Sequence, residues 1–304
     1  MLNINENIKM IKNRNQLGAI YMTLSVLFFC FMDILIKITH EYDVGQVMFS
    51  RAIFGLIPIF FLIPKERLKD FYKTKNVSLH FYRSFVGAIA MYAIFIGLRN
   101  LELAEVTSLA FSGPIWVVIF SILFLGEKVR TRRWIAVGLG FIGVLIISKP
   151  GFDNLNLYYI YPVIFTLGFA GVSIFIRKLT LAGEPVYLIA FYFSVCSAIF
   201  GLFTLPFGGW SVPTSYDLVL FILIGLFGST ANLLLTKSYQ LAEVSLTTPL
   251  KYLSLVFAII FGFYLFNEVP TIYTLSGAGL IVISSAIIFI REHQLKKPIT
   301  LPRQ

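Results

Sequence analysis

The chain carries few charged residues for its length. Asp, Glu, Lys and Arg make up only 13% of its 304 residues, whereas a soluble domain has about 25%. Apolar residues reach 58%. This composition excludes an ordinary soluble domain and indicates a protein whose outer surface meets lipid.

Cysteine and histidine are also scarce. The two cysteines, Cys30 and Cys196, fall within apolar runs, and His40, His80 and His293 are far apart in the sequence. The cysteines therefore indicate no disulfide framework, and neither residue type forms a metal-ligand cluster. An integral membrane enzyme would need clustered His, Asp, Ser or Cys near the membrane surface. We therefore predict no enzyme, no cofactor and no metal.

Most of the sequence consists instead of long apolar runs. We count ten: 17–36, 44–63, 80–98, 103–125, 134–148, 157–176, 186–206, 217–236, 244–266 and 271–290. Runs of about 20 apolar residues are typical of transmembrane helices. The longest segment between runs, 64–79, leaves no room for a soluble nucleotide-binding domain, so no ATPase subunit is implied. The pattern Gly138-x-Gly140-x-x-Gly143 fits a dinucleotide fingerprint, but inside an apolar run close helix packing explains it better.

The second half of the chain repeats the first. Leu103-Ala104-Glu105-Val106 returns as Leu241-Ala242-Glu243-Val244, Gly126-Glu127 matches Asn267-Glu268, and Asp33 to Lys37 matches Ser173 to Arg177. Because each copy has five spans, an odd number, the second copy must enter the membrane from the opposite side. We predict an all-α integral membrane protein of ten transmembrane helices in two inverted five-helix repeats. The repeats occupy 17–148 and 157–290, with an N-terminal segment 1–16, a linker 149–156 and a tail 291–304.

The basic residues predict the orientation of the chain. With both termini in the cytoplasm, twenty Lys and Arg fall on the inner side, with Arg83 counted among them. Only Lys37, Arg99 and Lys149 fall outside, while Arg51 and Lys251 lie within spans. This is the positive-inside bias of a membrane protein. It accounts for the net charge of +10 without nucleic acid as a partner.

Charged side chains inside the spans are the first candidate site residues, because a buried charge in a membrane is costly and usually functional. Arg51 lies about 10 Å into the second span and Asp33 about 6 Å from the outer end of the first. A pair between them would keep both charged, and Lys37, one turn from Asp33, could compete for it. Asp33 and Lys37 are candidates for gating or proton coupling. A purely structural ion pair is the alternative.

Two interrupted helices form the second candidate. Pro114 and Thr247-Thr248-Pro249 interrupt corresponding spans of the two repeats, with Lys251 just beyond the second. Paired breaks are the best sequence indication of a transporter's binding site, although Lys251 could instead extend to the cytoplasm. Trp116, Tyr252, Tyr92 and Tyr192 would line the cavity, with ordinary packing as the alternative. The predicted substrate-binding set is Arg51, Tyr92, Pro114, Trp116, Tyr192, Lys251 and Tyr252.

These features resemble a known family. The ten spans, the inverted repeat, the Ala-Glu-Val step before spans four and nine, and the Gly-Glu or Asn-Glu after them are similar to the EamA family of the drug/metabolite transporter superfamily. The segments Met32-Asp33-x-x-x-Lys37, Phe49-x-Arg51, Thr248-Pro249-x-Lys251-Tyr252 and Phe266-Asn267-Glu268 resemble a bacterial branch that contains S-adenosylmethionine uptake carriers. That branch has Pro-Tyr-Arg-Tyr and then an acid, where this chain has Pro249-Leu250-Lys251-Tyr252-Leu253-Ser254. The missing acid leaves Lys251 less neutralised, which weakens the case for a cationic substrate.

The resemblance implies alternating access by rocking helices around a central cavity, without ATP hydrolysis. We expect a secondary transporter of the bacterial inner membrane that moves a small polar metabolite, such as S-adenosylmethionine or an amino-acid-like compound. Arg51 and Lys251 would meet an anionic group of that substrate. An exporter of amino acids or drugs remains open, as does, in another class, a lipid scramblase. A closed central cavity would favour transport, and a groove open to lipid would favour the scramblase.

Overall fold

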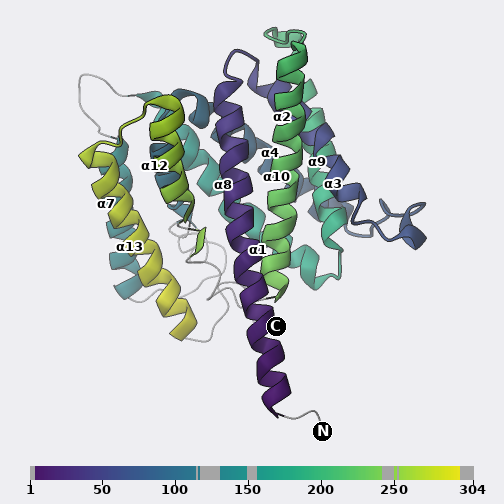
Figure 1. Cartoon of the computed structure of the whole chain (residues 1–304), viewed down its shortest axis with the longest axis horizontal. Helices are drawn as coiled ribbons and strands as arrows, with labels where there is room; N and C mark the ends of the chain where they lie inside the picture. The colour runs from purple at the N-terminus through teal and green to yellow at the C-terminus, as the bar shows by residue number, and fades with distance from the viewer. Residues whose placement is uncertain are drawn as a thin grey trace.

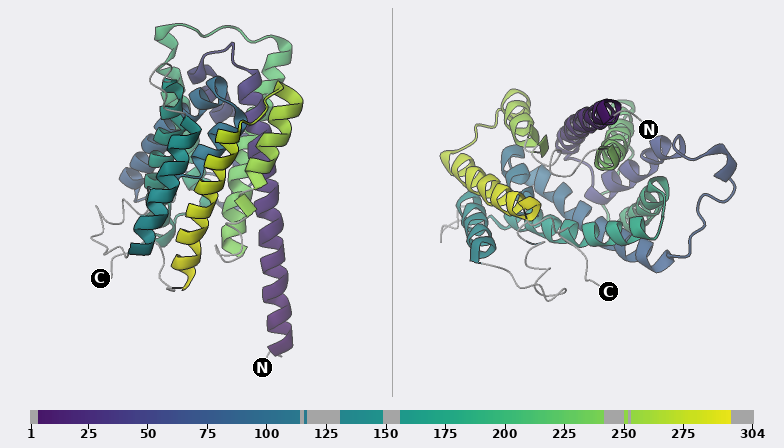
Figure 2. Two further views of the ribbon diagram at one scale, coloured as in Figure 1. Left: turned by 90° about the vertical axis from the view of Figure 1, so that its left-hand side faces the viewer. Right: turned by 90° about the horizontal axis from the view of Figure 1, so that it is seen from below.

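The computed structural model describes residues 4–113, 116, 131–148, 156–241, 250–251 and 253–294, and within these ranges it is a bundle of helices without strands (Figure 1). Helix α1 begins and helix α13 ends at the same end of the bundle (Figure 2). We call this the terminal end and the opposite one the far end.

The first half of the chain contains α1 (Ile4–Ile38), α2 (Val44–Phe54), α3 (Leu56–Phe60), the short 3-10 helix η1 (Lys65–Arg67), α4 (Val77–Asn100), α5 (Leu103–Ala110) and α7 (Thr131–Ser148). The second span is thus divided at Gly55. A Cβ at this position would lie 2.3 Å from Ser229 Oγ of the second half, so the glycine allows the two halves to approach closely.

The second half contains η2 (Leu157–Tyr159), α8 (Ile160–Leu181), α9 (Val186–Leu202), η3 (Leu205–Phe207), α10 (Ser215–Leu241), α12 (Leu253–Phe266) and α13 (Ile272–Gln294). Five described helices are long and apolar enough to cross a membrane, and four more are apolar but shorter. The predicted run 103–125 begins with α5 and continues beyond the described residues. The count of ten spans therefore stays a prediction.

The helices pair across the two halves. Helix α1 packs on α10 and α4 on α8, while α2 packs on α9 and α7 on α13. If spans 1–5 are matched with spans 6–10, the α1–α10 contact becomes the α8–α4 contact. The α2–α9 and α7–α13 contacts map onto themselves. The packing therefore has the pseudo-two-fold relation expected of two related halves.

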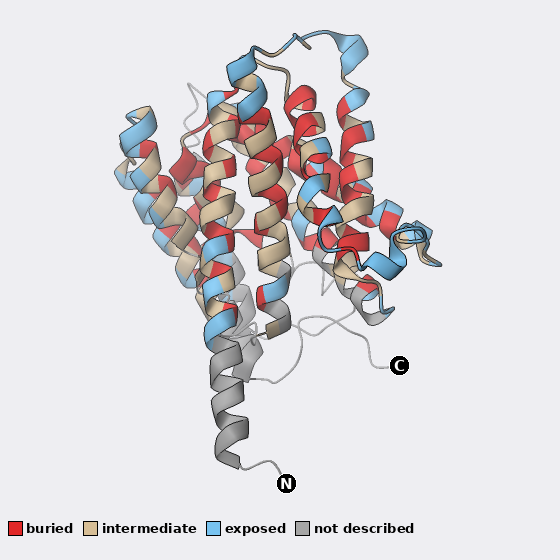
Figure 3. Cartoon of the chain, turned by 45° about the vertical axis from the view of Figure 1, so that its right-hand side comes forward, coloured by how far each residue is buried: buried red, intermediate tan, exposed pale blue. Residues whose placement is uncertain are grey.

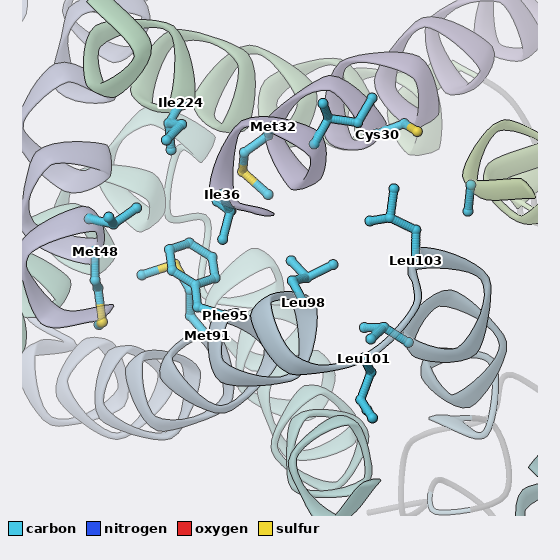
Figure 4. Packing of buried hydrophobic residues seen from close by; sticks show 14 of the residues in the cluster. Cys30, Met32, Ile36, Met48, Met91, Phe95, Leu98, Leu101, Leu103 and Ile224 are labelled. Carbon is cyan, nitrogen blue, oxygen red and sulfur yellow. The ribbon is translucent and has the colours of Figure 1, made fainter. Parts of the chain in front are cut away.

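Apolar side chains fill the inside of the bundle and also cover much of its outside. Met32 and Ile36 of α1 face Phe95 and Leu98 of α4 in the largest buried cluster (Figure 4). Large side chains such as Phe141 and Phe263 are exposed, and Figure 3 shows exposed residues along the outer helices. Exposed apolar surface over whole helices is what a lipid-facing protein needs.

Close helix crossings use small residues. A Cβ on Gly143 of α7 would lie 2.7 Å from the carbonyl oxygen of Gly277 on α13, and one on Gly277 would lie 2.7 Å from that of Gly143. The two backbones therefore touch where these helices cross. Gly143 belongs to the fingerprint-like pattern of the sequence, and helix packing accounts for it.

Candidate functional site

Arg51 lies between the two halves, near the middle of the apolar stretch Val44–Phe60. It is 6% exposed, and its Nε–H donates to Met32 Sδ at 3.4 Å. Its guanidinium carbon is 5.9 Å from the centre of the Phe193 ring on α9. A charged group buried this deeply needs a neutralising partner or a ligand.

Asp33 of α1 is the acid whose charge acts on Arg51. The structure brings the two residues near one another, as the sequence suggested, but among the described residues no ion pair shorter than 4.0 Å joins them. The two charges are therefore separated neighbours and not a direct salt bridge.

A second arginine, Arg83 of α4, is buried beside the first. It is 5% exposed, and its guanidinium carbon stacks 4.1 Å from the centre of the same Phe193 ring. From the sequence, Arg83 was expected on the cytoplasmic side, near the start of its span, but not as part of the site; it is the seventh residue of α4, which begins at Val77, and is buried. The predicted span 80–98 already contained this position.

Glycines make room for this group. A Cβ on Gly228 of α10 would lie 2.6 Å from Met32 Sδ and 2.9 Å from Arg51 Nε, and one on Gly87 of α4 would lie 3.0 Å from a ring carbon of Phe193. Neither approach leaves space for a larger residue. The positions of Arg51 and of the Phe193 ring thus depend on the absence of a side chain at Gly228 in α10 and at Gly87 in α4.

Lys37 joins the two halves at the far end. It forms a salt bridge with Glu268, which follows α12, and donates to the carbonyl oxygen of Leu101 at 2.6 Å. Glu268 also accepts the backbone N–H of Leu103, the first residue of α5, at 2.8 Å. Lys37 therefore pairs with an acid from the other half and not with Asp33, its neighbour on the same helix.

A second contact of the same kind lies nearby. Glu105 in the first turn of α5 accepts a hydrogen bond from the Tyr159 hydroxyl at 2.8 Å, and Thr274 Oγ lies 3.5 Å from the same oxygen. The short helix η2, which precedes α8, and the start of α13 are thus tied to α5. The contacts of Lys37 and Glu105 together bind the two halves at the far end. Lys37, Leu101, Leu103, Glu105, Tyr159, Glu268 and Thr274 are called the far-end network below.

The interrupted spans are described in part. Helix α5 ends at Ala110 and a turn follows at Phe111 and Ser112, as the sequence predicted for this span. Pro114 and Tyr252, like the segment Thr247-Thr248-Pro249, lie outside the described residues. Trp116 is half-buried and helical, and Lys251 is half-buried just before α12.

The two tyrosines predicted for the cavity take different positions. The Tyr92 ring packs on Phe200, with ring centres 5.8 Å apart, at the edge of the apolar core. Tyr192 donates its hydroxyl to the carbonyl oxygen of Tyr72 at 2.8 Å and stacks on His80 with ring centres 4.5 Å apart. Tyr192 is therefore held by the loop between α3 and α4, and only its chain neighbour Phe193 contacts the arginines.

Glu184 organises the loops next to this tyrosine. Its carboxylate accepts hydrogen bonds from Thr74 and from Asn76 Nδ2, the latter at 2.8 Å, and lies 3.6 Å from His80 Nε2. Burial by itself raises the pKa of this carboxyl, but the hydrogen bonds from Thr74 and Asn76 and the charge of His80 outweigh burial and hold the pKa below its ordinary value. The charged form of Glu184 therefore links the 61–76 loop to the turn before α9.

The centre of the bundle thus holds two guanidiniums, one carboxylate and an aromatic ring between two packed halves. This set offers hydrogen-bond donors and charge but no nucleophile placed beside a base. It can hold a small charged molecule, and the far-end network joins the elements that would move around it. Fold and site together define a class, the helical membrane carriers made of two related halves.

The comparison with known families agrees. The EamA-like transporter family matches residues 16–149 and again 156–290, so the chain belongs to this family, as its sequence motifs indicated. It is a multi-pass membrane protein of the drug/metabolite transporter superfamily and a transporter of small metabolites, not an enzyme.

Three relatives show the range of this family. The chain is 28% identical over 255 residues to an S-adenosylmethionine uptake transporter of Rickettsia conorii, covering 83% of this chain and 84% of the relative. It is 27% identical over 287 residues to a riboflavin transporter of Rhizobium johnstonii, covering 94% of both. It is 26% identical over 271 residues to the pseudopaline exporter CntI of Pseudomonas aeruginosa, covering 88% of this chain and 94% of the relative.

Proposed function

We propose that the chain is a secondary transporter that carries S-adenosylmethionine or an amino-acid-like compound by alternating access. Similarity to S-adenosylmethionine uptake transporters over 83% of the chain supports this substrate. The observation that carries the proposal is the buried Arg51, with the half-buried Asp33 as its neighbouring acid, between the two halves. A substrate bound there would contact both halves, and rocking them would expose it to either side in turn.

Arg51 and Lys251 would bind the anionic group of the substrate, while Tyr92, Pro114, Trp116, Tyr192 and Tyr252 would line its path. Asp33 would gate the site or accept a proton, because its charge acts on Arg51. Lys37 would gate from the far end, where its pairing with Glu268 joins the halves. Release of that pair would let the far end open.

The protein would lie in the bacterial inner membrane with both termini in the cytoplasm. The positive-inside distribution of Lys and Arg supports this orientation, even with Arg83 removed from the count. The repeats would occupy 17–148 and 157–290, linked by the external segment 149–156 and flanked by cytoplasmic segments 1–16 and 291–304. The bilayer and a small metabolite would be its partners, with no ATPase subunit.

Export is the second candidate for direction, because a relative over 88% of the chain is named an exporter. Uptake and export place the same demands on a carrier, since the site must be reached from both sides. The direction is set in the cell by the gradient and by coupling. Measurement in vesicles of known orientation therefore decides it.

Uptake of labelled S-adenosylmethionine into proteoliposomes tests the proposal. We expect saturable uptake that S-adenosylhomocysteine inhibits and that Arg51→Ala and Lys251→Ala abolish. Arg67→Ala, at an exposed residue of η1, is the matched control and keeps wild-type uptake. If the protein is folded and oriented but shows no uptake, S-adenosylmethionine is not its substrate. Uptake of amino acids, riboflavin and drugs would then be measured.

A further inference from the structure

We propose that Arg83 and Arg51, which both lie over the Phe193 ring, form a binding site for the carboxylate of the transported metabolite. The proposal rests on the transport function above and adds to it a residue and a substrate class. The three side chains come from α4, α2 and α9, with guanidinium carbons 4.1 Å and 5.9 Å from the ring centre. The site therefore spans helices of both halves.

The charges at this site do not balance. Asp33 is the acid that acts on Arg51, whereas the charge that acts most strongly on Arg83 is that of Arg51, which repels it. Within the described part of the chain neither arginine forms an ion pair shorter than 4.0 Å. One carboxylate thus faces two guanidiniums, and a single bound anion would neutralise the group.

The hydrogen bonds of Arg83 are likewise incomplete. Its Nε and Nη1 atoms are buried and, among described residues, have no acceptor, and the buried Ser197 hydroxyl on α9 also lacks a partner. Ser197 is one turn from Phe193, on the same helix face. Buried donors without acceptors are rare in folded proteins. Here two of them belong to the guanidinium that lies over the Phe193 ring, where a ligand oxygen would satisfy them.

The stacking explains why these donors stay available. A guanidinium lying over an aromatic ring uses its face for the cation–π contact, so its N–H groups still point outward in its plane. A planar carboxylate can then accept two parallel N–H bonds, the geometry in which arginine binds carboxylates best. Phe193 thus holds Arg83 in place without occupying its donors.

The test compares S-adenosylmethionine with its decarboxylated form, which keeps the sulfonium and the amino group. Equilibrium binding of both is measured on the purified full-length protein by titration calorimetry. Hydrogen bonds to charged groups correspond to about 10- to 100-fold in affinity, so we expect the wild type to prefer the carboxylate form by that factor. Arg83→Gln should lose this preference and bind the decarboxylated form as wild type does.

Two further variants separate binding from structure. Arg83→Lys keeps the charge but not the two parallel N–H donors of a guanidinium, so it should retain part of the preference for the carboxylate form. Arg67→Gln, at an exposed residue, should retain all of it. Ligand-free Arg83→Gln should melt at or above the wild-type temperature, because it removes a buried charge without a partner. A lower melting temperature with equal losses for both ligands would make Arg83 a structural residue and overturn the proposal.

Other outcomes are equally decisive. If wild type binds neither form, S-adenosylmethionine is not the substrate, and the comparison is repeated with methionine and tyrosine against their decarboxylated amines. Equal binding of both members of each pair would overturn the carboxylate site and leave transport standing. Binding of no member of any pair would overturn the carboxylate site together with the substrate class.

Discussion

Gly228→Ala tests whether transport depends on the position of Arg51. The new Cβ would lie 2.6 Å from Met32 Sδ and 2.9 Å from Arg51 Nε, whereas non-bonded heavy atoms prefer about 3.5–4.0 Å. The sulfur must therefore move by about 1 Å and the guanidinium by about 0.6 Å or more. Both are ends of flexible side chains, so the helices can stay in place while the arginine shifts.

The expected effect on function is larger than that on stability. Overpacking of this kind costs about 1–3 kcal/mol, which a helical Gly→Ala change offsets by about 0.8–1 kcal/mol. A misplacement of about 1 Å in a binding group can cost about 100-fold in rate. We expect uptake to fall about 10- to 100-fold in Vmax/KM, while the protein remains monodisperse and its melting temperature changes by a few degrees.

Gly279→Ala is the matched control, because a Cβ there meets nothing within 4 Å. It should transport like the wild type. Met32→Ala removes the atom that the new Cβ would meet first, so the double variant Gly228→Ala/Met32→Ala should recover part of the loss. The reasoning is refuted if Gly228→Ala transports within about twofold of Gly279→Ala at equal amounts of folded protein.

Three further predictions concern the ends and the helix crossings. Glu268→Gln leaves Lys37 without its acid and should lower the free energy of unfolding by about 1–3 kcal/mol. Thermal unfolding in detergent measures this effect. An unchanged midpoint would show that the salt bridge does not stabilise this state. The lowered pKa of Glu184 means that its contribution to stability is complete above about pH 5 and is lost as pH falls through the folded-state pKa. The stability difference between wild type and Glu184→Gln should therefore shrink with acid, and a constant difference from pH 7 to pH 3 would contradict the assignment. Gly143→Leu should separate α7 from α13 and lower expression and melting temperature, whereas Gly138→Leu, where a Cβ meets nothing within 4 Å, should be tolerated.

The positions of the helices follow from the sequence because a bilayer requires long apolar runs. The predicted run 186–206 corresponds to α9, Val186–Leu202, with η3 ending at Phe207, and 217–236 corresponds to α10, Ser215–Leu241. Helix α10 extends beyond its apolar run because the more polar residues that follow position 236 are helical as well. The division of the second span at Gly55 was not predicted, although Pro58, which has no N–H to donate to the Phe54 carbonyl one turn back, lies three residues further along.

The partners of charged residues were harder to predict. Lys37 has Asp33 one turn away, yet it binds Glu268, 231 positions further along the chain. A pair on one helix contributes only about 0.2–0.5 kcal/mol, so contacts between halves outweigh it. Arg83 was counted only as an inner-side cation, because cations near span ends usually face water. The ring that holds it, Phe193, is one of 31 phenylalanines. Only the packing of α4 on α9 distinguishes this phenylalanine from the others.

Counterflow is the most direct test of the alternating-access carrier. Proteoliposomes are loaded with unlabelled S-adenosylmethionine and diluted into a small amount of labelled compound. A carrier whose site faces one side at a time accumulates label transiently above its equilibrium level, and then releases it. We predict this overshoot for the wild type and its absence in Arg51→Ala. A monotonic approach to equilibrium, as through a pore or a scrambling groove, would contradict the account.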